Sequence, residues 1–266
     1  MPFDQDDLPR IELVQNPLKM VVAQLRFPAE LSLNEPETMA AFQARLRDQY
    51  PIALPRQAGI RWQVQIPPGP SVVVPAPQQV PFEGPLRFTD GQNNWVASFD
   101  ETTLSLETKA YLNGEQFRAR WARLIEVFLE LVSPARVDRF GIRYVNQLWH
   151  PGVRSVEDWG RFLRPELMGA IASTTLSARV IRSSGQIWLA VGDDGGSIRH
   201  LYAQNPERVE PPSTVLLDFD LFSAGSFPFN SLEIMTRFDR YHKWAWNLFR
   251  QSITDEMVES LGVNQE

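Results

Sequence analysis

Two stretches of this sequence, one in the middle of the chain and one near its end, carry the same pattern of aromatic and aliphatic residues. FRARWARLIEVFLELVSPAR begins at Phe117, and FDRYHKWAWNLFRQSITDEM begins at Phe238. In both, apolar residues recur at spacings of three and four, which predicts a long amphipathic helix that buries one face. Two such helices, each following a series of short apolar runs, indicate an internal duplication of the chain.

The order of the other expected elements is also similar in the two halves. The first half is expected to contain a strand, a helix, a proline-rich stretch, three short strands and a long helix, at residues 18–27, 35–49, 51–85, 86–88, 95–99, 103–108 and 113–134. The second half is expected to contain a strand, a short helix, four strands and a closing helix, at residues 137–149, 155–163, 174–182, 186–191, 197–203, 214–222 and 231–261. In this half SSGQ and GDDGG are expected to be turns.

The fold class predicted from this order is α+β, built from duplicated β-α-β4-α units. We expect two curved antiparallel sheets, each packed on its own long helix. This order of elements resembles that of the TATA-binding protein and of helix-grip ligand-binding domains, a likeness of fold that implies no function. The expected boundaries are an acidic N-terminal tail at 1–17 and halves at 18–134 and 135–266, which form one pseudo-symmetric body.

Residues 51–85 form a proline-rich arm, since nine of these 35 residues are proline. Proline lacks a backbone donor, which excludes a helix here and restricts strands to edges or short pieces. RWQVQI (61–66) alternates polar and apolar residues and is the one strand expected in the arm. Because apolar residues continue through the segment, we expect an ordered arm rather than a free linker.

The amino-acid composition excludes several classes of protein. The chain has 26 basic and 32 acidic residues, a net charge of −6, and no cysteine, which excludes disulfides, thiolate metal sites and a cysteine nucleophile. The acidic start and the lack of a long apolar run predict a cytoplasmic protein that does not enter a membrane. Between Arg118 and Arg182, eleven arginines stand against six acids. The net negative charge of the chain argues against a nucleic-acid partner, although the arginine-rich middle segment leaves such a partner possible.

Motifs for catalysis or cofactor binding are missing. His150, His200 and His242 have no second ligand at a metal-binding spacing, so no metal site and no cofactor is expected. His242 lies on the apolar side of the closing helix and is interpreted first as a core residue. GDDGGS (192–197) is interpreted as a hairpin turn rather than a phosphate loop, because no helix follows it.

The binding candidates lie on two expected strands and on the closing helix. Alternation places Arg139 and Arg143 on one face of their strand, with Tyr144 and Asn146 on the other. In LLDFDLF, Asp218 and Asp220 share the face opposite Leu217, Phe219 and Leu221. Two interpretations remain open: the arginines pair with these carboxylates inside the protein, or they line a concave surface for an anionic partner. The full set of candidates is Arg139, Arg143, Tyr144, Asn146, Asp218, Asp220 and His242.

Three segments carry a resemblance to a known family. They are NPLKMVVAQLRF, RFGIRYVNQL and YHKWAWNLFRQSITDEM. The chain is similar along nearly its whole length to a sporadically distributed bacterial family of uncharacterised proteins with an R-x-G-x-R-Y-x-N strand, here Arg139, Gly141, Arg143, Tyr144 and Asn146. It departs from that family in having Tyr241 before His242 and in its proline-rich arm. The resemblance implies an accessory or immunity-like role in a mobile or defence-associated system and supplies no catalytic residue.

Three functional hypotheses follow. The first is a non-catalytic binding or interaction protein whose partner is another protein. The second is a helix-grip small-ligand-binding protein, which requires a cavity between the sheet and a long helix. The third is a hydrolase that uses Asp218, Asp220 and His242, which requires these three side chains to converge.

Overall fold

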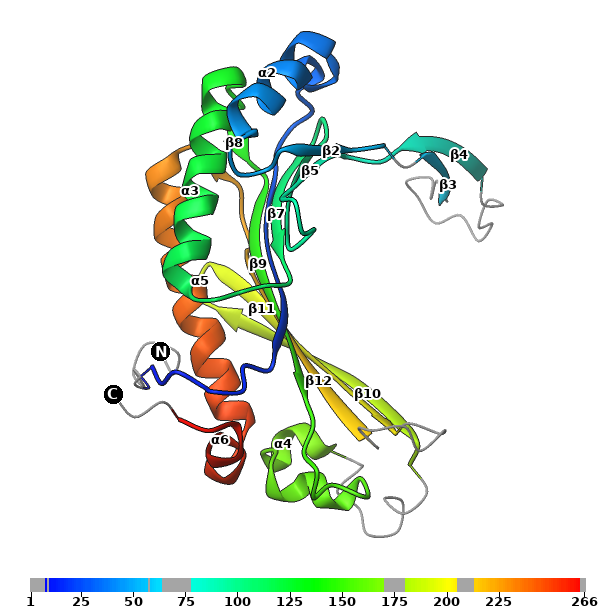
Figure 1. Ribbon diagram of the computed structural model, residues 1–266, viewed down its shortest axis with the longest axis vertical. Coiled ribbons are helices and arrows are strands. Elements are labelled where there is room, and N and C mark those ends of the chain that lie inside the picture. Colours follow the sequence, from blue (N-terminus) through cyan, green and yellow to red (C-terminus); the bar gives the residue numbers. More distant parts are fainter. Residues whose placement is uncertain are drawn as a thin grey trace, which may run out of the picture.

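The computed structural model describes residues 8, 10–56, 58–63, 78–169, 180–204 and 213–263. It is an α+β structure with one large antiparallel sheet and a few helices (Figure 1). The strand order of the large sheet is β10-β11-β12-β9-β1-β7-β6-β5-β2. Its strands are β1 (Leu18–Arg26), β2 (Ile52–Leu54), β5 (Leu86–Thr89), β6 (Trp95–Phe99), β7 (Thr103–Thr108), β9 (Arg139–Leu148), β10 (Arg182–Val191), β11 (Asp194–Gln204) and β12 (Ser213–Ser223).

The expectation of two separate sheets is wrong. β1 pairs antiparallel with β9, with Ala23 opposite Ile142, so the strands of both halves form one continuous sheet. Direct pairing of β1 with β9 removes two strand edges that would otherwise be exposed. From this central pair outward, each half continues with its last strand and then runs backward through the chain.

Two helices lie on the same face of the sheet (Figure 1). α3 (Gly114–Leu131) begins at Asn113, whose side chain accepts a hydrogen bond from the backbone N–H of Gln116, and it ends before Pro134. α5 (Ser231–Ser252) begins at Asn230, which caps it in the same way. Their buried aromatic rings form the centre of the core, and Phe117 of α3 stacks on Phe238 of α5 at 5.9 Å.

The closing helix is two helices rather than the single one expected at 231–261. α5 ends at Ser252, and α6 (Asp255–Leu261) begins after Thr254, whose Oγ1 accepts from the backbone N–H of Met257. The break follows from tertiary contacts. The backbone N–H of Thr254 donates to the carbonyl of Phe162, and that of Arg164 donates to the carbonyl of Ser252.

The expected SSGQ turn is also wrong, because these residues lie inside β10. Ser183, Ser184 and Gly185 pair with Tyr202, Leu201 and His200 of β11. A Cβ atom at Gly185 would stand 2.4 Å from Cε1 of His200, so this glycine allows close packing rather than a reversal of the chain. The GDDGG segment does form a tight turn, in which Gly192 has a φ of 61°. The expected strand at 174–182 lies mostly outside the described residues.

The remaining elements are short. The expected helix at 155–163 is a 3-10 turn, η2 (Glu157–Arg161), followed by α4 (Pro165–Met168). α2 (Pro36–Leu46) follows another 3-10 turn, η1 (Leu31–Asn34), and packs on α3. β8 (Arg136–Val137) and β13 (Phe227–Pro228) form a separate two-stranded sheet.

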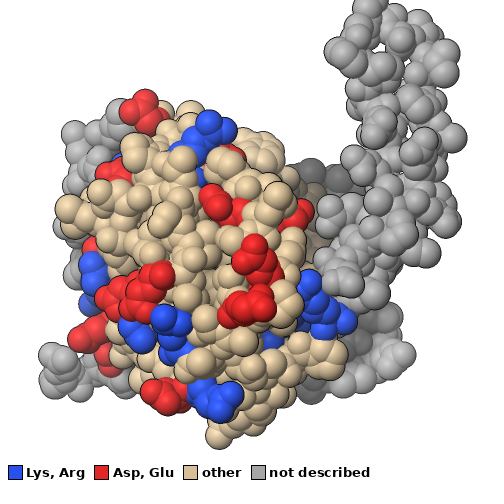
Figure 2. Space-filling model, turned by 90° about the horizontal axis from the view of Figure 1, so that it is seen from above, with Lys and Arg blue, Asp and Glu red and all other residues tan. Residues whose placement is uncertain are grey.

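The surface at the end of the molecule that carries α2 has acidic and basic side chains interspersed (Figure 2).

The proline-rich arm has more regular structure than expected. β3 (Ala58–Gln63) pairs antiparallel with β4 (Gln78–Glu83), and this hairpin projects from the main body (Figure 1). β4 was not expected because it contains Pro81, but both strands of a two-stranded sheet are edges, where a missing donor is tolerated. Only the first half of RWQVQI lies in the described part of β3. In the part of the chain that the structure describes, no helix has the length and apolar character needed to span a membrane.

Candidate functional site

β9 and β12 place the candidate residues on opposite faces of the sheet, as their alternation predicts. Phe140 and Tyr144 of β9 contact Trp121 of α3 and His242 of α5, so they lie on the covered face. Arg139 and Arg143 lie on the other face, which we call the open face because neither α3 nor α5 covers it. Asp218 and Asp220 of β12 lie on this open face too.

The arginines of the open face are paired with carboxylates. Arg143 donates Nε–H and Nη2–H to the two carboxylate oxygens of Asp218, at 2.8 and 2.7 Å, and Arg199 of β11 donates to the same carboxylate. Arg139 donates to Asp220 at 3.0 Å. The Asp218 side chain is only 3% exposed, whereas that of Arg143 is 40% exposed. This pairing of arginines with carboxylates inside the protein is one of the two interpretations that the sequence left open. The main role of Arg143 is therefore structural.

The residues of the hydrolase hypothesis do not converge. Asp218 and Asp220 lie on the open face, while His242 lies on α5 over the covered face, bonded to Tyr144. The sheet therefore separates the carboxylates from the imidazole. Within the described ranges, no group of three or more His, Asp or Glu side chains is arranged to hold a metal ion.

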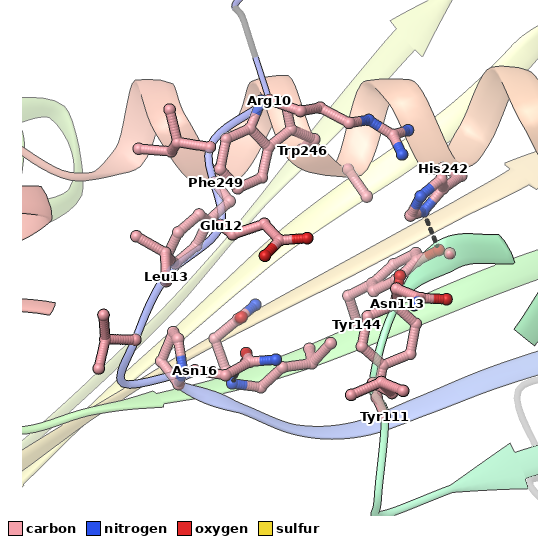
Figure 3. Close-up of a pocket in the computed structure, with 18 residues that line it drawn as sticks. Arg10, Glu12, Leu13, Asn16, Tyr111, Asn113, Tyr144, His242, Trp246 and Phe249 are labelled. Atoms are coloured by element: carbon pink, nitrogen blue, oxygen red, sulfur yellow. Dashed lines mark hydrogen bonds between the residues drawn. The ribbon is translucent and has the colours of Figure 1, made fainter. Parts of the chain in front are cut away.

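Three candidates meet instead at a cavity of about 630 Å³, which we call the N-terminal pocket (Figure 3). It lies between the N-terminal segment, the loop that precedes α3, the covered face of β9 and one side of α5. Its lining comprises residues 10–14, 16–18 and 111–114, together with Tyr144, Asn146, His242, Ala245, Trp246 and Phe249. Tyr144, Asn146 and His242 were candidates from the sequence, and the pocket brings them together.

The inner end of the pocket is a hydrogen-bonded pair of rings. The Tyr144 hydroxyl and Nδ1 of His242 are 2.7 Å apart. The Nε2 atom of His242 is buried and has no hydrogen-bond partner among the described residues. A Cβ atom at Gly114 would stand 2.2 Å from Nε2, so glycine at the start of α3 is what lets the imidazole lie there.

Burial keeps this end of the pocket uncharged. The pKa of His242 is lowered from 6.5 to about 4, chiefly by burial and also by the nearby Arg10, while Asp239 acts weakly in the opposite sense. Burial raises the pKa of Tyr144 well above 10 and that of Tyr111 to about 12. At neutral pH the pair is therefore a neutral imidazole and a neutral phenol, which can donate and accept hydrogen bonds but carry no charge.

Sequence reasoning missed the wall formed by the N-terminal segment. The backbone N–H groups of Val14 and Gln15 donate to the carbonyls of Gly262 and Leu261, and Trp246 Nε1–H donates to the Leu8 carbonyl. The sequence predicted that these residues form an acidic tail. The hydrogen bonds instead hold them against α5 and α6. Arg10 and Glu12 then lie over the pocket (Figure 3). The apolar residues of IELV (11–14) were the one signal that this segment packs on the body.

The pKa of His242 predicts a pH dependence of stability. Between pH 6.5 and about 4 the unfolded chain binds a proton at this imidazole that the folded chain does not, so stability falls as the pH falls through this window. The upper limit is about 3 kcal/mol, at roughly 1.4 kcal/mol per pKa unit. Urea unfolding of wild type and His242→Asn at pH 7 and pH 4.5 measures it. We expect the variant to lose less stability between the two pH values, and equal losses would contradict the assignment.

No model of a known protein family matches this chain, and no curated protein matches it either. A function is therefore inferred from the geometry of the N-terminal pocket and of the open face.

Proposed function

We propose that this chain is a non-catalytic binding protein that holds a small ligand in the N-terminal pocket. The observation that carries the proposal is the cavity between the sheet and α5, lined by Tyr144, Asn146 and His242. A cavity in this position is what the helix-grip hypothesis requires. The competing hypothesis, in which Arg143 is the main binding residue, loses support because Arg143 is bidentate with a buried carboxylate.

The lining suggests the chemistry of the ligand. Trp246, Phe249 and Leu13 supply apolar surface, and the cavity of about 630 Å³ lies within the usual range for small-molecule sites. At the inner end, Tyr144 and His242 favour an uncharged hydrogen-bonding group such as a carbonyl or hydroxyl, because a charge there would lose its hydration. The ligand is thus a mainly apolar molecule with one neutral polar end.

We infer in addition that the two halves are copies of one unit, as in the TATA-binding protein or helix-grip folds, although four strands follow β1 in the sheet and only three described strands follow β9. Three observations support this. The strands of both halves follow the same order outward from the central pair, and α3 and α5 cover the same face. Phe117 and Phe238, which are equivalent in the sequence comparison, stack on each other, as equivalent residues near a pseudo-twofold axis do.

The pocket is expected to bind the neutral fluorescent probe N-phenyl-1-naphthylamine. Its fluorescence should rise saturably with protein, and Glu12→Trp should weaken binding at least about tenfold, because Glu12 is exposed and its side chain projects into the cavity (Figure 3). Ala40→Trp, on an exposed part of α2, is the matched control and should bind as wild type does. Unchanged binding in Glu12→Trp would place the probe elsewhere and count against the proposal.

A further inference from the structure

The two edges of the large sheet differ in how they are protected. β2, at one edge, has three residues and is flanked by Pro51 and Pro55. β10, at the other edge, has ten residues and no proline or lysine. Proteins usually shorten an edge strand or interrupt it with proline or lysine to prevent another chain from pairing with it. β10 lacks these devices, and no described strand pairs with its outer edge, so the backbone groups there can accept a further strand.

The turn between β10 and β11 determines which backbone groups of β10 point outward. The two-residue turn at Gly192 and Asp193 closes on the pair Val191 and Asp194, and hydrogen-bonded pairs then alternate along the strands. The N–H and C=O groups of Ser184, Gln186 and Trp188 therefore point away from β11. The same three residues direct their side chains to the open face. No described residue hydrogen-bonds to these outward backbone groups.

A basic pocket of about 430 Å³ lies on the open face beside β10. Its lining includes Arg143, Arg182 and Arg199 but only one acid, Asp218. Arg143 and Arg199 share that buried carboxylate and remain 40% and 44% exposed, while Arg182 is exposed. Three guanidinium groups against one carboxylate leave a local excess of positive charge in a chain of net charge −6. This pocket matches an acidic side chain.

An exposed tryptophan lies farther along the same strand. Trp188 is 68% exposed on the open face and contacts Phe222 edge to face at 6.3 Å. The guanidinium of Arg139 covers the Phe222 ring at 4.4 Å, which fixes the ring beneath Trp188. Exposed tryptophan next to arginine is typical of residues that dominate the binding energy of protein interfaces. Trp188 thus offers an apolar contact four residues from Ser184, which lies at the basic pocket.

We propose that the exposed edge of β10 binds an extended acidic segment of a partner protein as a tenth strand of the sheet. The backbone of β10 supplies the hydrogen bonds, the basic pocket takes a carboxylate, and Trp188 takes an apolar side chain four residues from it along the partner strand. A second copy of β10 does not meet these requirements, because RSSGQIWLAV contains no Asp or Glu. This surface lies on the face opposite the N-terminal pocket, so it is independent of the small-ligand proposal.

Fluorescence anisotropy with synthetic peptides tests the proposal. The probe is a fluorescein-labelled peptide of about ten residues, made of Thr and Val with one Glu and one Phe four positions apart, prepared in both orders because either strand direction is possible. The control peptide has Lys in place of Glu. We expect one order of the Glu peptide to bind at least about tenfold more tightly than its Lys counterpart. Arg182→Glu, which leaves two arginines against two acids in the basic pocket, should abolish that preference.

Gln186→Pro tests the backbone contribution, since it removes an outward N–H and leaves the bonds to β11 intact. We expect it to weaken peptide binding at least about tenfold with an unchanged melting temperature. If this variant unfolds, Trp188→Ala, which removes an exposed side chain, replaces it. Equal binding of the Glu and Lys peptides, no binding of any peptide, or binding unchanged in both variants would overturn the proposal. Dimerisation that Gln186→Pro abolishes, without peptide binding, would assign the edge to a second copy instead.

Discussion

Asp194→Ala is expected to lower the free energy of unfolding by about 3 to 5 kcal/mol. Asp194 is the first residue of β11, and its side chain is 2% exposed. It accepts hydrogen bonds from Arg237, Arg240 and Tyr241 of α5, at 2.6, 2.9 and 2.7 Å. The variant leaves the buried Tyr241 hydroxyl and the largely buried Arg237 without this acceptor and removes the polar link between α5 and the β10–β11 hairpin. Urea unfolding monitored by circular dichroism measures the loss.

Asp193→Ala is the control for this prediction. Asp193 precedes Asp194 in the same turn, but it is exposed. Its replacement should change stability by less than about 0.5 kcal/mol. Equal stability of the two variants would show that the Asp194 cluster contributes little and that apolar packing alone holds α5 on the sheet.

The double variant Arg143→Ala/Arg199→Ala is expected to cost a similar amount, about 3 to 5 kcal/mol, because it leaves the buried carboxylate of Asp218 without either of its arginines. Arg143→Ala alone should cost about 1 to 2 kcal/mol, since Arg199 remains bonded. The cost of the double variant should therefore exceed the sum of the two single variants. Thermal and urea unfolding of the three proteins measures this non-additivity.

Adding Asp218→Asn to the double variant distinguishes charge from packing. A neutral amide at this position no longer carries an unpaired charge, so the triple variant should recover much of the lost stability. No recovery would mean that the arginines stabilise the sheet through their aliphatic stems rather than through the ion pairs.

The faces of β9 and β12 could be predicted from the sequence because strand side chains alternate with a period of two. The same period made pairing between the arginines and aspartates one of two open interpretations. The period of two could not decide between internal pairing and a surface for an anionic partner, since the outcome depends on which strands are neighbours in the sheet. In the sheet Arg143 lies directly opposite Asp220 but makes its bidentate contact with Asp218.

The N-terminal pocket could not be predicted because its walls come from segments far apart in the chain. The contact between Leu8 and Trp246 spans almost the whole sequence, and no local pattern encodes it. The joining of the halves through β1 and β9 is similarly long-range. Gly185 misled the interpretation in another way, because Ser-Ser-Gly is typical of a turn, whereas here glycine makes room for the His200 ring.

We propose that this protein binds a small, mainly apolar ligand between the sheet and α5. A crystal structure of the complex with N-phenyl-1-naphthylamine tests it most directly. We expect ligand density in the N-terminal pocket, with the aromatic rings against Trp246 and Phe249 and the amine within hydrogen-bonding distance of Tyr144 or His242. Density on the open face or elsewhere on the surface, with none in the N-terminal pocket, would contradict it.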